Sequence, residues 1–147
     1  MKTNELSTDL RIGNWIKYED KLVQVVQLSS LMILCQKDEN QFLVNCAPEV
    51  FQPIELTEEV LLKIGFKKVF QSKVTKGRFE LNVDMGDNEF RNIVYHIYAS
   101  GNTNLNITQR RCASLCDDSM DKSGIKYLHQ LQNAYFILTG EELNIEL

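Results

Sequence analysis

The sequence predicts an α+β protein made of an N-terminal SH3-like β-barrel, a short bridging helix, and an antiparallel sheet covered by a C-terminal amphipathic helix. Short runs of strand-forming residues, separated by turn formers, recur in both halves of the chain. Two segments with helical features follow these runs, one near the middle and one at the end. The expected organisation is a β half over residues 1–55, a helix over 56–66, and a sheet with its helix over 67–147, which could form one compact unit.

Five short strands are predicted between Leu10 and Ile54. They correspond to the runs RIGNWIKY, KLVQVVQLSS, LMILCQ, QFLVNC and VFQPI. Polar turn formers separate them, among them Glu19-Asp20 and the sequence KDEN. So many short strands in so short a span are typical of a small barrel of the SH3-like kind.

A short helix is predicted over residues 56–66, because both of its ends are marked. Thr57 is a good N-cap residue. Glu58 and Glu59 lie in the first turn, where the helix dipole favours negative charge. Gly65 is expected to end the helix. A helix this short is not stable in isolation, so we expect it to dock between the two halves.

The second half is predicted to return to strands. RFELNVD and FRNIVYHIYAS flank a hairpin turn, and LNITQ follows a second turn. In the longest strand successive side chains would point to opposite faces. One face would carry Ile93, Tyr95 and Ile97, and the other Val94, His96 and Tyr98. The polar stretch from Arg110 to Gly124 is expected to be a loop.

The stretch IKYLHQLQNAYFILTGEEL, residues 125–143, predicts an amphipathic helix. Its apolar side chains fall on one stripe, which would cover a sheet. The stripe consists of Leu128, Leu131, Tyr135 and Leu138. Ser123 is a suitable N-cap residue and Gly140 a suitable terminating glycine.

The charge pattern disfavours nucleic acid as a partner. The chain has a formal net charge of −4, whereas nucleic-acid-binding domains usually carry a basic face. The basic clusters are short and consist of Lys67-Lys68, Lys73/Lys76/Arg78 and Arg110-Arg111. No apolar run reaches the length of a membrane span, and the opening MKTNELSTDL lacks the apolar core of a signal peptide. We therefore expect a cytoplasmic protein that does not contact a membrane.

The segments LRIGNW, PIELTEEVLLKIGF and IKYLHQLQNAYFILTGEEL stand out along the chain. They resemble recurring segments of a family of small uncharacterised proteins from gut bacteria of the Bacteroidales type, some of them encoded in phage-derived or mobile regions. The family has no assigned activity. The resemblance therefore implies a bacterial, cytoplasmic origin and identifies no catalytic residue.

Enzymatic chemistry would depend on the two histidines. His129 could act as a general base oriented by Asn133 one turn later, and His96 is the second candidate. The alternative for His129 is a half-exposed side chain on the flank of the apolar stripe, hydrogen-bonded along the helix. No nucleophile or phosphate-binding motif accompanies either histidine, so catalysis is not expected.

No metal and no cofactor are expected. Cys112 and Cys116 have a spacing that a metal site tolerates, but a second matching pair is missing. Cys35 and Cys46 lie on separate predicted strands. In a cytoplasmic protein all four residues are interpreted as thiols and not as disulfides.

Two pairs of residues are candidate binding groups. Trp15 and Tyr18 in the first strand could form an exposed aromatic platform, or they could belong to the core. Arg110 and Arg111 could bind a phosphate or a carboxylate, or they could form a solvated edge. The favoured hypothesis is a non-catalytic protein-binding or adaptor protein of mobile-element origin, with an unknown protein partner. A nucleic-acid-binding module and a small enzyme that uses one of the histidines are the alternatives.

Overall fold

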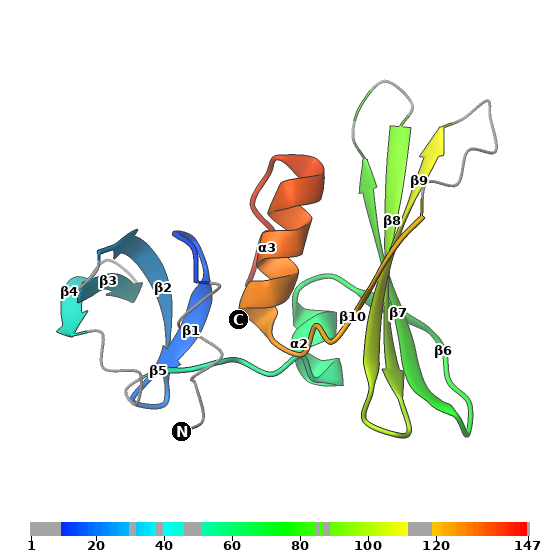
Figure 1. Ribbon diagram of the computed structural model, residues 1–147, viewed down its shortest axis with the longest axis horizontal. Coiled ribbons are helices and arrows are strands. Elements are labelled where there is room, and N and C mark those ends of the chain that lie inside the picture. The colour runs from blue at the N-terminus through cyan, green and yellow to red at the C-terminus, as the bar shows by residue number, and fades with distance from the viewer. Residues whose placement is uncertain are drawn as a thin grey trace. The chain divides into compact units, whose positions relative to one another are not determined.

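The computed structural model describes residues 10–29, 32–37, 40–45, 51–84, 86, 89–111 and 119–146. The chain divides into two compact units (Figure 1). The first consists of Met1–Leu56 with Tyr127–Leu143, and the second of Thr57–Lys126 with Asn144–Leu147. Each unit contains one antiparallel five-stranded sheet.

The sheet of the first unit has the strand order β4-β3-β2-β1-β5. In chain order its strands are β1 (Trp15–Tyr18), β2 (Lys21–Leu28), β3 (Met32–Lys37), β4 (Asn40–Asn45) and β5 (Phe51–Gln52). The predicted turn at Glu19-Asp20 joins β1 to β2, and both residues adopt the left-handed conformation, with φ of 46° and 63°. This conformation is the one that a two-residue hairpin turn of the favoured twist requires.

One face of the first sheet forms a hydrophobic core. The buried residues are Ile16, Val23, Val25, Ile33, Cys35 and Phe51. Val23 and Val25 are two positions apart on β2, and a β-strand directs such residues to the same side. The strands predicted from strand-forming runs are therefore confirmed, with ends that differ by a few residues.

The predicted SH3-like barrel is wrong. Among the described strands, β4 pairs with β3 and β5 pairs with β1, so the sheet is open and both of these strands are edges. β5 contains only two residues, and Pro53 follows it directly. Proline has no backbone N–H and cannot extend a hydrogen-bonded ladder. β5 pairs with β1 but does not reach β4, so the described strands do not close into a barrel.

The sheet of the second unit has the strand order β10-β9-β8-β7-β6. Its strands are β6 (Lys67–Phe70), β7 (Thr75–Asp84), β8 (Glu89–Tyr98), β9 (Thr103–Arg111) and β10 (Ser119–Ser123). The register places Phe79 opposite Tyr95, and Tyr95 opposite Leu105. All three are buried and lie on the same face. The predicted alternation of β8 is confirmed, because Ile93 and Tyr95 share this buried face.

Helix α2 (Glu58–Lys63) belongs to the second unit and confirms the predicted end signals. The Thr57 side chain accepts a hydrogen bond from the Val60 amide at 3.3 Å. Gly65 has φ of +97°, and the amide of Phe66 donates to the carbonyl of Leu61 at 3.0 Å. Leu61, Ile64 and Phe66 are buried, so this short helix is held by packing, as its length requires.

The predicted loop from Arg110 to Gly124 is wrong at both ends. β9 continues through Arg111, and Ser119–Ser123 form the edge strand β10. β10 pairs antiparallel with β9, from Ser119 opposite Thr108 to Ser123 opposite Asn104. Its sequence SMDKS has a low strand propensity, and an existing neighbour strand that offers a hydrogen-bonding edge overrides such local preferences. Cys112 and Cys116 lie outside the described residues.

Helix α3 (Leu128–Thr139) begins five residues after the predicted N-cap Ser123. The delay has a tertiary cause. The carbonyl of Ile125 accepts hydrogen bonds from the hydroxyls of Tyr95 at 2.6 Å and Thr103 at 2.7 Å, which keeps the preceding segment on the second sheet. The predicted end is confirmed, since Gly140 is left-handed with φ of 73° and its amide donates to Phe136.

The fold class also needs correction where the C-terminal helix is concerned. α3 belongs to the first unit, whereas the sequence predicted it as part of the C-terminal half. The amide of Leu128 donates to the carbonyl of Ile54 at 2.8 Å, and Glu55 forms a β-bridge with Tyr127. The molecule is a mostly β protein of two open sheets, in which the helix attaches to the N-terminal sheet.

Candidate functional site

The two aromatic residues proposed as a platform do not share a face. Trp15 and Tyr18 are three positions apart on β1, so their side chains point to opposite sides of the sheet. The Tyr18 ring packs on Phe51, with a centroid distance of 5.7 Å, and lies against the hydrophobic core. Trp15 is half-buried, and its amide donates to the Gln132 side chain at 2.9 Å. A common aromatic platform on β1 is therefore excluded.

His129 is fully buried, so its predicted place on a half-exposed flank is wrong. Its ring stacks on that of Tyr127 at a centroid distance of 5.9 Å and an interplanar angle of 10°. The prediction failed because residues outside the predicted apolar stripe of α3 are buried as well. The buried residues of this helix include Leu128, His129, Leu131, Gln132, Ala134 and Tyr135. A buried ring of this kind contributes to packing.

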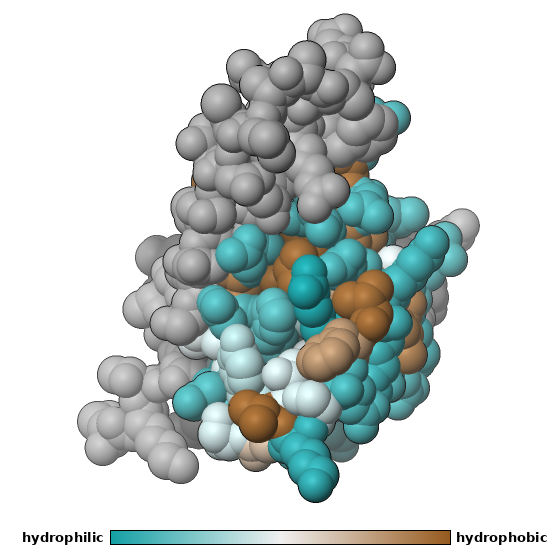
Figure 2. Space-filling view, turned by 90° about the vertical axis from the view of Figure 1, so that its right-hand side faces the viewer, coloured by the Kyte–Doolittle hydropathy of each residue, from teal (hydrophilic) through white to brown (hydrophobic). Residues whose placement is uncertain are grey.

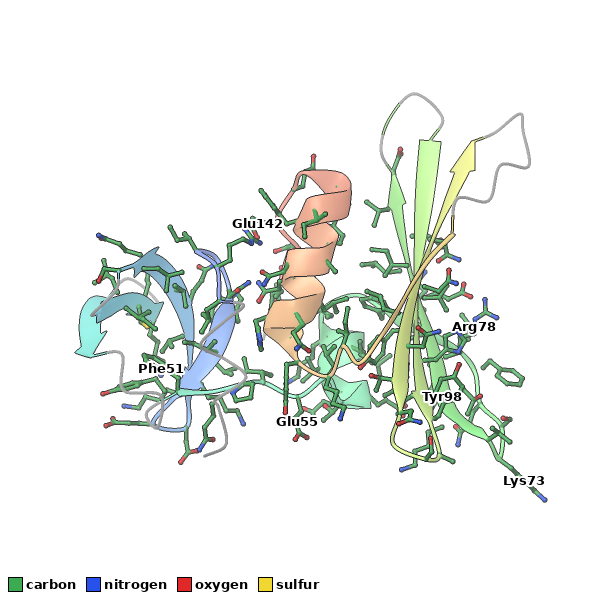
Figure 3. All side chains as sticks on the ribbon, viewed as in Figure 1. Phe51, Glu55, Lys73, Arg78, Tyr98 and Glu142 are labelled. Atoms are coloured by element: carbon green, nitrogen blue, oxygen red, sulfur yellow. The ribbon has the colours of Figure 1, made fainter. Side chains whose placement is uncertain are left out.

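Asn133 joins a polar network with the N-terminal segment of the first unit. Its Oδ1 atom accepts hydrogen bonds from Asn14 Nδ2 at 3.0 Å and from Arg11 Nε at 3.2 Å. Arg11 also donates to both carboxylate oxygens of Glu142, at 2.5 and 2.9 Å. Its guanidinium lies 4.2 Å from the centroid of the Phe136 ring. Glu142 is labelled beside the end of α3 in Figure 3.

A second part of this network is more deeply buried. Gln132 is 1% exposed, and it bridges a carbonyl just before β1 and the first amide of β1. Its Oε1 accepts from the Trp15 amide, and its Nε2 donates to the Gly13 carbonyl at 3.1 Å. Gln24 Nε2 donates to the same carbonyl at 3.2 Å. These contacts attach α3 to β1 through polar side chains, which a search for an apolar stripe does not find.

The remaining sequence candidates stay untested as sites. Arg110 and Arg111 are backbone members of β9, opposite Phe90 and Glu89, but the positions of their side chains lie outside the described part. Within the described ranges, no group of three or more His, Cys, Asp or Glu residues is arranged to hold a metal ion. Cys35 is a buried thiol of the first core. The cysteines at 46, 112 and 116 lie outside the described residues.

The face of the second sheet opposite Phe79 and Tyr95 is mainly polar, although it includes the buried Val94. The register places Arg78 opposite His96, and His96 opposite Asn104. The rings of His96 and Tyr98 stack at 5.8 Å with an interplanar angle of 9°. Arg78 forms a salt bridge with Glu80 at 2.6 Å. Figure 3 shows Arg78 and Tyr98 on this sheet.

At the edge of the same sheet, the β6–β7 hairpin (residues 67–78) exposes large apolar side chains. Val69 is 50% exposed, Phe70 54% and Val74 70%. These three residues are called the apolar cluster below. Phe70 pairs with Arg78 across the hairpin, so the Phe70 side chain lies on the same face of the sheet as Arg78. Figure 2 looks onto the side that bears β6, where brown apolar side chains stand among teal polar ones.

The hairpin is also the most basic stretch of the chain. Its sequence KKVFQSKVTKGR holds four lysines, one arginine and no acidic residue. The other 135 positions hold eleven basic and twenty acidic residues, so the hairpin has the opposite sign of charge from the rest of the chain. In the sequence these cations form short clusters that are offset by acidic residues elsewhere, so they did not indicate a site.

The turn of the hairpin is held by its own hydrogen bonds. The Ser72 hydroxyl accepts from the amides of Val74 at 3.2 Å and Thr75 at 3.0 Å. The Ser72 amide donates to the Thr75 carbonyl at 2.8 Å, and the Ala99 amide donates to the Val74 carbonyl at 2.8 Å. The exposed side chains therefore stand on a fixed backbone.

Burial raises the pKa of the Tyr95 hydroxyl above 10, its ordinary value, although a hydrogen bond with Thr103 acts in the opposite direction. A raised pKa in the folded state means that this tyrosine stabilises the fold fully below pH 10 and loses that contribution as the pH rises through the folded-state value. We expect the second unit to lose stability above about pH 10, and Tyr95→Phe to reduce this alkaline loss. Urea unfolding between about pH 9 and pH 11 measures the difference. An unchanged pH dependence in the variant would contradict the assignment.

No protein-family model, curated protein or solved structure matches this chain. Among the described residues, no helix combines the length and the apolar character needed to cross a membrane.

Proposed function

We propose that this protein is a non-catalytic protein-binding or adaptor protein and that its contact surface is the apolar cluster on the β6–β7 hairpin. The carrying observation is that Val69, Phe70 and Val74, all at least 50% exposed, fall within six residues of one hairpin. Scattered single apolar residues are normal on a protein surface, whereas several large exposed ones within a single hairpin favour an interaction site. A bacterial, cytoplasmic origin in a mobile region belongs to the same proposal and is supported by the resemblance alone.

The rigid backbone of the hairpin supports this function. A binding loop that must become ordered loses conformational entropy, which weakens association. Here the Ser72 hydroxyl and the bond from Ala99 to Val74 hold the turn before any partner arrives. The apolar side chains are therefore presented without a large ordering cost, as in preorganised protein interfaces.

Site-specific photocrosslinking tests the proposal. A benzophenone amino acid is placed at Val74, or at Ile137 of α3 as a control that is 78% exposed, in cells of the native host. We expect a defined protein to crosslink at the first position and not at the second. That protein is then purified, and its affinity is measured for the wild type and for the triple variant V69S/F70S/V74S.

The triple variant should bind the purified partner at least about 30-fold more weakly, since an apolar anchor at the centre of an interface is typically worth 2 kcal/mol or more. The exposed positions should leave the melting temperature nearly unchanged. The variant I12S/I137S, which removes two exposed isoleucines of the first unit, should bind like the wild type. Equal binding by V69S/F70S/V74S, or crosslinks at Ile137 alone, would overturn the proposal.

A further inference from the structure

We infer that the β6–β7 hairpin recognises an acidic segment of its protein partner, in which carboxylates flank apolar side chains. This inference rests on the proposed function and specifies the chemistry of the partner. It is carried by three exposed lysines close in sequence to the apolar cluster, none of which forms a salt bridge within the described ranges.

Two of the basic residues of the hairpin form salt bridges with glutamates. Lys68 donates to both oxygens of Glu58 at 2.9 Å, and Arg78 is bound to Glu80. Within the part of the chain that the structure describes, Lys67, Lys73 and Lys76 form no salt bridge. All three are exposed. Lys67 lies opposite Glu80 in the register, but the salt bridge of Glu80 is made with Arg78.

These three lysines lie next to the apolar cluster. Lys73 immediately precedes Val74 in the turn, and Figure 3 shows it projecting away from the sheet. Lys76 follows two residues later, and Lys67 begins β6 two residues before Val69. Protein interfaces commonly combine an apolar centre with a polar rim, and here the rim is cationic. The complementary surface is apolar in its centre and anionic at its edge.

The charges near the hairpin favour an acidic protein segment over a polyanion. Acidic residues stand on both faces of the sheet near the hairpin: Glu58 is bound to Lys68, which lies opposite Phe79 in the register, and Glu80 is bound to Arg78 on the other face. The chain as a whole has a net charge of −4, which repels an extended array of phosphates. Two members of the apolar cluster are valines, which offer no aromatic ring for stacking on bases. A short segment with separated carboxylates can contact Lys67, Lys73 and Lys76, which form no salt bridge among the described residues, without approaching many acidic groups.

Exposed charges at the rim of an interface act mainly on the association rate, and salt screens them. Removing the three lysines should therefore slow association and reduce its salt dependence. Removing the apolar cluster should instead accelerate dissociation. The two sets of variants thus have different kinetic signatures.

The test uses a fluorescent probe peptide in which Glu alternates with Leu, and a second peptide in which Gln replaces every Glu. Binding of each peptide is measured by anisotropy for the wild type and for K67Q/K73Q/K76Q. The matched control K17Q/K21Q/K37Q removes the same number of positive charges from the first sheet. Oligothymidylate and vesicles containing phosphatidylserine serve as alternative anionic probes.

We expect the Glu peptide to bind the wild type and to lose about tenfold in affinity with K67Q/K73Q/K76Q, against less than about twofold with the matched control. The Gln peptide should bind at least about tenfold more weakly than the Glu peptide. Equal binding of the two peptides, an equal loss with the control, or tighter lysine-dependent binding of oligothymidylate or vesicles would overturn the inference.

The two proposals fail separately. If the crosslinked partner loses binding with V69S/F70S/V74S but binds K67Q/K73Q/K76Q like the wild type, the hairpin is a protein-binding surface without acidic specificity. If neither variant changes that affinity, the proposed function itself is wrong.

Discussion

Replacing Gln132 with alanine is expected to lower the free energy of unfolding of the first unit by about 2–4 kcal/mol. Gln132 is 1% exposed and links α3 to the backbone at the start of β1 through two hydrogen bonds. Alanine would leave the Trp15 amide without its acceptor and would open a small cavity. A buried polar group without a partner typically costs about 1–3 kcal/mol, and each of the two bonds contributes to the loss.

The single tryptophan of the chain provides the measurement. Trp15 lies on β1, beside the contact that the substitution removes, so its fluorescence reports urea unfolding of the first unit. Gln24→Ala is the matched control, because Gln24 donates to the same Gly13 carbonyl but is half-buried and makes one such bond. We expect the control to lose about 1 kcal/mol or less. If both variants unfolded at the wild-type urea midpoint, the polar attachment of α3 would not contribute to stability.

Replacing Gly77 with alanine is expected to destabilise the second unit by about 3 kcal/mol. A Cβ atom at this position would lie 2.5 Å from Cε2 and 2.7 Å from Cζ of the Phe79 ring. Phe79 is fully buried opposite Tyr95, so its ring has no free space to move into. The close approach explains why the hairpin has a glycine at the irregularity between β7 and β8, after Thr75.

A second substitution tests the cause. Phe79→Leu removes part of the ring and should cost about 1–2 kcal/mol by itself. In the double variant G77A/F79L the new methyl group no longer meets the ring, so the combined loss should be at least about 1 kcal/mol smaller than the sum of the two single losses. Urea unfolding followed by circular dichroism gives these values, and hydrogen exchange assigns them to β7 and β8. Additive losses would show that the contact with Phe79 is not the cause.

The proposed binding surface on the β6–β7 hairpin could be predicted from the sequence only in part. The basic residues Lys67, Lys73 and Lys76 were visible as charges, but their meaning depended on their neighbours. The sequence of β6 does not show whether this strand lies in the middle or at the edge of its sheet. The structure places β6 at an edge, where the Phe70 side chain is exposed and available for contact instead of buried in the core. Trp15 and Tyr18 are close in sequence, but side chains alternate along β1, so these two residues point to opposite faces of the sheet.

Local elements could be predicted from the sequence where their signals come from neighbouring residues. Thr57 and Gly65 marked the ends of α2, Gly140 marked the end of α3, and the runs of β-branched and aromatic residues marked the longer strands. These features depend on backbone conformation and on hydrogen bonds within one turn, so a short window of sequence contains their causes.

Four features depend on contacts between distant parts of the chain and could not be predicted: the open first sheet, the strand β10, the start of α3, and the unit to which α3 belongs. Each depends on a partner that is distant in sequence: β10 pairs with β9, and the Ile125 carbonyl is held by Tyr95. The helix joins the first unit through Gln132 and Asn133, whose hydrogen-bond partners lie more than 100 positions away. A helical wheel assigns such polar residues to solvent, because it contains no information about distant groups that can satisfy them in the interior.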